Sequence, residues 1–86
     1  MITKAMEIKI PQGLDPGTIA LFIQIASQYD SRVYVEVGNK KVNAKSLMGM
    51  MTLGVAHGEE VTVSADGADE KQALRHILSY LSNEEE

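Results

Sequence analysis

The spacing of the apolar residues is the feature that most limits what this chain can fold into. The spacing switches repeatedly between the alternation of a half-buried strand and the one-sided stripe of an amphipathic helix. Strand spacing covers residues 5–10, 31–37, 41–44 and 59–65, and helical spacing covers residues 16–28, 47–53 and 70–81. The predicted order is therefore strand, helix, strand, strand, helix, strand, helix.

The first two elements are separated by residues that interrupt regular structure. In "AMEIKI", Met6, Ile8 and Ile10 lie on one side of the predicted strand, and Pro11 and Gly13 end it. The helix that follows carries its apolar residues at helical spacing: Ile19, Phe22, Ile23, Ala26 and Tyr29.

The remaining elements are marked by turn and capping residues. "GNK" predicts a tight turn between two strands, because Gly and Asn tolerate positive φ. Gly54 is placed to end the short helix, and Asp69 with Gln72 predicts a variant of the capping box for the last helix. The expected core stripe of that last helix is Ala73, Leu74, Ile77, Leu78 and Leu81.

These elements predict an α+β fold, an open-faced β-sandwich. Three helices would cover one face of a mainly antiparallel four-stranded sheet. No internal repeat or linker divides the chain, so residues 1–86 are expected to form a single domain. The absence of cysteine means that packing must stabilise it without disulfides.

Composition excludes several classes of function. Twelve acidic residues against eight basic ones give a net charge of −4, and the scattered Lys and Arg argue against binding to nucleic acid or to a membrane surface. The first ten residues lack the apolar core of a signal peptide, so a cytoplasmic location is expected, and the acidic end "SNEEE" is expected to be a solvated tail. His57 and His76 have no ligand spacing around them, so neither a metal site nor a cofactor is expected.

Asp15 stands at the start of the first helix, in "GLDPGTIALF". Aspartate is a preferred N-cap and proline is favoured at the first helical position, so Asp15 followed by Pro16 predicts a helix cap. The alternative is an acyl-phosphate acceptor. That chemistry usually requires a divalent cation held by neighbouring carboxylates, and none is adjacent in the sequence.

Ser46 opens the short helix in "NAKSLMGMM". It is a standard N-cap, and it is also a possible phosphorylation site, since the helix dipole would favour the added negative charge. Met50 and Leu53 are predicted to lie in the core. Leu47, Met48 and Met51 are more apolar residues than so short a helix can bury, which predicts an exposed contact patch.

Two further groups have both a structural and a functional interpretation. Leu21 and Ile25 flank the core stripe of the first helix, either as a partly exposed apolar edge or as an extension of a contact surface for a partner or for self-association. Lys45 is either a solvated charge or a cation able to approach a phosphate on its neighbour.

The order of elements and the segment "KKVNAKSLMGMMTLGVAHGEEVTVSADGADEKQAL" resemble the HPr family, the histidine-containing phosphocarriers of the sugar phosphotransferase system. "NAKSLMGMM" is similar to the Gram-positive regulatory branch of that family, and within it most similar to the catabolite-repression HPr-like (Crh) members, which lack the phosphoacceptor histidine but keep the regulatory serine. The family's active loop reads Gly, Leu, His, any residue, Arg, Pro. This chain keeps the first two and has Asp15, Gly17 and Thr18 in place of the histidine, arginine and proline.

The resemblance implies a regulator that is not an enzyme. Ser46 would be phosphorylated by HPr kinase/phosphorylase, and Leu47, Met48 and Met51 would contact CcpA, a LacI-type catabolite control protein. Family members also exchange their first strand to form dimers, so a homodimer is possible. Two alternatives remain open: an atypical phosphocarrier that uses Asp15 or another acceptor, and an HPr-fold interaction domain without phosphorylation.

Overall fold

The computed structural model describes residues 1–83 and contains the seven predicted elements in the predicted order. They are β1 (Ile2–Glu7), α1 (Pro16–Ser27), β2 (Arg32–Val37), β3 (Lys40–Asn43), α2 (Leu47–Met51), β4 (Glu60–Asp66) and α3 (Glu70–Leu81). Residues 84–86, which make up most of the acidic end, lie outside the described residues. No helix in residues 1–83 combines the length and the apolar character needed to cross a membrane.

The strands form a single sheet in the order β1-β4-β2-β3, and every neighbouring pair is antiparallel. Val63 of β4 lies opposite Lys4 of β1 on one side and Val35 of β2 on the other. Gly38 has a φ of 61°, as the predicted turn between β2 and β3 requires. The expected antiparallel sheet is confirmed.

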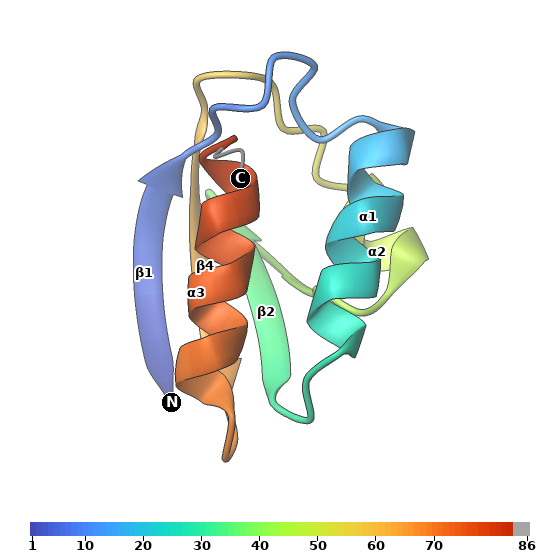
Figure 1. Ribbon diagram of the computed structural model, residues 1–86. Coiled ribbons are helices and arrows are strands. Elements are labelled where there is room, and N and C mark those ends of the chain that lie inside the picture. The colour runs from blue at the N-terminus through green and yellow to red at the C-terminus, as the bar shows by residue number, and fades with distance from the viewer. Residues whose placement is uncertain (84–86) are drawn as a thin grey trace.

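All three helices cover one face of the sheet, as Figure 1 shows. α3 packs against β1 and β4, and α1 lies beside both α3 and α2. The largest fully buried apolar side chains come from β2 and β4, from each helix, and from Ile8 just after β1: Phe22, Ile8, Met50, Ile77, Leu81, Val33, Val35, Val61 and Val63. The α+β open-faced sandwich is therefore confirmed.

The first strand lies earlier in the chain than its alternation predicted. β1 ends at Glu7 because its ladder partner β4 begins at Glu60, directly opposite. Ile8 is still fully buried, but its N–H donates to the Glu59 carbonyl at 2.9 Å, outside the ladder. The apolar spacing thus identified the buried side chains, whereas the length of the partner strand determined where β1 ends.

The start of α3 differs from the predicted capping box. Asp69 occupies the N-cap position, but its side chain makes no capping hydrogen bond. Its carboxylate instead accepts hydrogen bonds from the backbone N–H groups of Asp30 at 2.9 Å and Ser31 at 3.0 Å, and from the Ser31 hydroxyl. Glu70 accepts from the Gly67 N–H at 3.0 Å. Asp69 therefore links the start of α3 to the turn between α1 and β2, a contact between segments far apart in the sequence.

Two loops meet beneath the start of α1. The N–H of Leu14 donates to the Val55 carbonyl at 2.9 Å. Gly13 has a φ of 68°, and a Cβ added there would lie 2.7 Å from the Val55 oxygen and 2.9 Å from the Ala56 Cα. A glycine at position 13 therefore allows the loop before α1 to lie against the loop after α2.

Replacing Gly13 by alanine should destabilise the protein more than the same change at Gly54. Both glycines have a left-handed backbone conformation, with φ of 68° and 61°, but a Cβ at Gly54 would meet nothing within 4 Å. A left-handed alanine costs about 1–2 kcal/mol, and the clash with Val55 should add at least about 1 kcal/mol to the loss for Gly13→Ala. Urea denaturation of both variants measures the difference, and equal losses would contradict the close approach of the two loops.

The contribution of Asp69 to stability should depend on pH. The hydrogen bond from the Ser31 hydroxyl, followed by that from the Asp30 N–H, lowers the pKa of Asp69 below its ordinary value. A lowered pKa means that the stabilisation is present above the unfolded-state pKa of about 4 and is lost as pH falls through the folded-state value. The melting temperatures of the parent chain and Asp69→Ala should therefore differ at pH 7 and converge in acid. A pH-independent difference would contradict this role.

Candidate functional site

Ser46 caps the N-terminus of α2. Its backbone is extended, with φ −103° and ψ 115°, and its Oγ accepts a hydrogen bond from the Gly49 N–H at 3.2 Å. The residue is half-buried, so part of it faces solvent. The predicted N-cap is confirmed, and the partial exposure leaves open the second interpretation of this serine, as a phosphorylation site.

The segment before Ser46 is ordered by its own side chains. The Asn43 side chain accepts from the Lys45 N–H at 2.8 Å, and the Asn43 carbonyl accepts from the Ser46 N–H at 3.0 Å. The Lys45 ammonium donates to the Tyr29 carbonyl, just after the end of α1, at 2.6 Å. Lys45 is thus not simply a solvated charge, because its ammonium lies at the carboxyl end of α1, where the helix dipole favours a cation. Its approach to a phosphate on Ser46 stays a prediction.

α2 and the turn that follows it divide their apolar residues between core and surface as predicted. Met50 is fully buried and Leu53 is 8% exposed, whereas Met48 is 81%, Leu47 51% and Met51 53% exposed. A helix of five residues presents only one turn to the core, so the other side chains must point outward. The predicted division between core and surface is confirmed.

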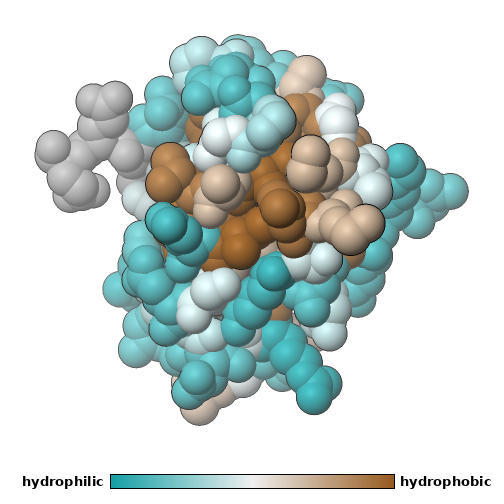
Figure 2. All heavy atoms as spheres, turned by 90° about the vertical axis from the view of Figure 1, so that its right-hand side faces the viewer, coloured by the Kyte–Doolittle hydropathy of each residue, from teal (hydrophilic) through white to brown (hydrophobic). Residues whose placement is uncertain are grey.

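α1 extends this exposed apolar area. Leu21 is 52% exposed, and α1 contacts α2. Figure 2 shows the apolar surface on the side of the molecule where α1 and α2 lie in Figure 1. We call the four residues Leu21, Leu47, Met48 and Met51 the α1–α2 patch. Ile25 is half-buried and packs against the core, so it contributes less exposed surface than they do.

Asp15 caps α1. Its Oδ1 accepts from the Thr18 N–H at 2.8 Å, and Pro16 follows at the first helical position. Hydrogen bonding from Thr18, mainly from its backbone N–H, lowers the pKa of Asp15, so the carboxylate is charged at neutral pH. Within residues 1–83 there is no group of three or more His, Cys, Asp or Glu side chains able to hold a metal ion. The cap predicted from the sequence is confirmed.

The surroundings of Asp15 include contacts that sequence patterns did not indicate. Thr18 is buried, and its carbonyl accepts from the Tyr80 hydroxyl of α3 at 3.2 Å. Burial raises the pKa of Tyr80, which therefore remains protonated and able to donate at neutral pH. Gly17 is exposed, and a Cβ there would meet only the Asp15 side chain, at 3.8 Å.

His76 also has a partner that its isolation in the sequence hid. The Tyr29 hydroxyl and the His76 Nδ1 are 2.8 Å apart, and the two rings meet edge to face. Tyr29 follows α1 and His76 lies on α3, so two residues that are 47 positions apart in the sequence join the end of α1 to α3. The only available signal was the apolar stripe of α1 extending to Tyr29.

Comparison with known proteins identifies the family. The family model described as "PTS HPr component phosphorylation site" matches residues 2–83. The HPr-like protein Crh of Bacillus subtilis is 43% identical over 84 residues, which is 98% of this chain and 99% of Crh. Its crystal structure, described as a dimer with a swapped domain, has a TM-score of 0.80 at 42% identity and covers 100% of this chain and 99% of its own. HPr-C-His from Thermoanaerobacter tengcongensis has a TM-score of 0.91 at 44% identity, with 100% of both chains covered. The chain belongs to the HPr family of the phosphotransferase system and is similar over almost its whole length to the HPr-like protein Crh.

Proposed function

We propose that this protein is a regulator of carbon catabolite repression that is controlled by phosphorylation of Ser46. The modifying enzyme is HPr kinase/phosphorylase, and the phosphorylated form acts in the cytoplasm as a corepressor-like partner of CcpA. The observation that carries the proposal is the position of Ser46: this half-buried serine directly precedes Leu47 and Met48, two exposed residues of the α1–α2 patch. A phosphate on this serine and the apolar side chains beside it would form one contact surface.

The surroundings of Ser46 are compatible with a phosphate. The first turn of α2 contains no acidic residue, so there is no adjacent carboxylate in this helix to repel the added charge of about −1.5 to −2. Gly49 presents its N–H to the Ser46 Oγ, and a Cβ at position 49 would lie 3.4 Å from that oxygen. The glycine thus leaves room beside the hydroxyl that would carry the phosphate.

Asp15 and Gly17 argue against phosphocarrier activity. A phosphocarrier of this family needs an imidazole nucleophile, and Asp15 offers a carboxylate that already accepts a hydrogen bond from Thr18. Gly17 supplies no cation for the transferred group, although the arginine it replaces would. We therefore propose that no residue of this loop accepts phosphate from Enzyme I.

A homodimer is a second element of the proposal. The Crh crystal structure is described as a dimer with a swapped domain. β1 is an edge strand with a single neighbour, β4, and a loop from Ile8 to Asp15 separates it from α1. Exchange of β1 between two copies would replace its contacts with β4 by the same contacts in the partner.

Phosphorylation assays with two donors separate the proposal from its alternatives. Incubation with ATP and HPr kinase/phosphorylase should add a single phosphate, seen by mass spectrometry as one increment of about 80 Da, which Ser46→Ala removes. Incubation with phosphoenolpyruvate and Enzyme I should add none. Phosphate on Asp15 from phosphoenolpyruvate would support the atypical phosphocarrier, and no phosphate from either donor would support an unphosphorylated interaction domain.

The α1–α2 patch should determine affinity for CcpA. Met48→Asp places a charge on the most exposed apolar side chain of the patch, and we expect it to weaken binding of the phosphorylated chain at least about tenfold, as at a central interface residue. Ala68→Asp makes the same type of change at an exposed site before α3 and should leave the affinity within about twofold. Equal effects of the two changes in a calorimetric titration would refute a role for the patch.

A further inference from the structure

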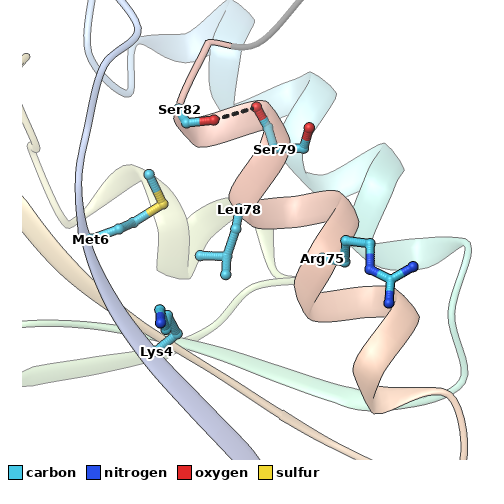
Figure 3. A pocket seen from close by; sticks show the side chains of 6 residues that line it. All are labelled: Lys4, Met6, Arg75, Leu78, Ser79 and Ser82. Atoms are coloured by element: carbon cyan, nitrogen blue, oxygen red, sulfur yellow. Dashed lines mark hydrogen bonds between the residues drawn. The ribbon is translucent and has the colours of Figure 1, made fainter.

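A groove runs between β1 and α3, away from the α1–α2 patch. It has a volume of about 500 Å³ and is lined by Lys4, Met6, Arg75, Leu78, Ser79 and Ser82. Figure 3 shows Met6 and Leu78 facing each other across it, with Lys4 beside Met6 on the strand and Arg75 on the helix. Leu78 was predicted to lie in the core, but it is half-buried, and its remaining surface forms one wall of this groove.

The charge of the groove is opposite to that of the whole chain. The protein carries a net charge of −4, yet the lining contains two cations and no carboxylate. The ion pairs within residues 1–83 join Met1 to Asp66 and Glu70, and Lys9 to Glu7. Lys4 and Arg75 take part in none of these pairs, so both charges can act on a bound molecule.

The groove continues across α3. Arg75 and Ser79 also line a second hollow of about 340 Å³, whose other walls are Tyr29, Gln72 and His76. Arg75 therefore lies on the ridge between two hollows, and neither hollow is lined by an acidic side chain. A cation in this position can reach a negative group bound on either side of the helix.

The groove lies next to a sheet edge. β1 is the first strand in the order β1-β4-β2-β3, so only one of its two edges has a neighbour within the sheet. An extended peptide can add to such an edge through main-chain hydrogen bonds, while alternate side chains pack on one face. Lys4 and Met6 project to the same face of β1, because side chains two apart along a strand share a face.

We propose that the groove and the free edge of β1 bind an extended acidic segment of a partner protein. The segment would add a strand beside β1, insert an apolar side chain between Met6 and Leu78, and place carboxylates near Lys4 and Arg75. Charge complementarity selects this occupant over a second copy of the chain, because a second β1 would bring another Lys4 toward a groove that is already cationic. This surface is separate from the α1–α2 patch, so the two can be occupied together.

NMR titration of the ¹⁵N-labelled full-length chain tests the proposal. The probe is the capped synthetic peptide Ser-Glu-Ser-Leu-Ser-Glu-Ser, in which the Leu and both Glu side chains share one face of an extended strand, with a matched peptide in which Lys replaces each Glu. The acidic peptide should shift the amide signals of Lys4, Ala5, Met6 and Leu78, and the basic peptide should not. Because the whole chain is negative, binding of an acidic peptide must come from the local charges of the groove.

Charge-reversed variants separate this site from general attraction. Lys4→Glu combined with Arg75→Glu should lower the affinity for the acidic peptide at least about tenfold and allow the basic peptide to bind. The control is Lys71→Glu, which lies on α3 outside the groove lining and should change the affinity for either peptide by less than about twofold. Should the double reversal unfold the chain, Lys4→Gln with Arg75→Gln applies the same test to the acidic peptide. Shifts elsewhere, an equal loss with Lys71→Glu, or amide shifts of the same size with the acidic and the basic peptide would overturn the proposal.

Discussion

Burial of one sheet face under three short helices is the constraint on which the rest of the structure depends. With no cysteine in 86 residues, the apolar contact between the covered face and the helix stripes must supply the stability. Phe22, Met50 and Ile77 bring one fully buried side chain from each helix to that contact. Once these side chains are in place, the ends of α1 and α2 are positioned too, and with them Asp15 and Ser46.

The same constraint positions α2 but does not explain why the surface is apolar over α1 and α2. α2 has five residues and buries Met50, so Leu47, Met48 and Met51 are left on the outside. A longer helix would have room for polar residues on its outer face, whereas this one is apolar at four of its five positions. The exposed methionines are therefore unexplained by stability and are consistent with an adaptable contact surface.

Periodicity predicted the fold well because it reports burial directly. The helices and the burial of Ile8 follow from the spacing of apolar residues, and the hairpin follows from the turn residues between its strands. Both signals depend only on residues close together in the sequence. Errors arose where a distant segment decided the outcome. β1 ends at Glu7 because β4 begins opposite it, and Asp69 binds the turn at Asp30 and Ser31 because the sheet brings them together.

In the candidate site, too, local features could be predicted from the sequence and contacts between distant segments could not. The caps at Asp15 and Ser46 could be predicted because capping depends on residues within one turn. The bond from Lys45 to the Tyr29 carbonyl, the Tyr29–His76 pair and the groove beside β1 could not, because each joins residues from different elements. The regulatory interpretation of Ser46 came from resemblance, since a serine at a helix N-terminus is in itself an ordinary cap.

Phosphate dependence of partner binding is the central claim, and one calorimetric comparison tests it most directly. CcpA is titrated with the full-length chain before and after stoichiometric phosphorylation, at the same salt concentration. The account predicts that the phosphorylated chain binds at least about tenfold more tightly, because charge-assisted contacts to the phosphate add to those of the α1–α2 patch. Equal affinities for the two forms would contradict it.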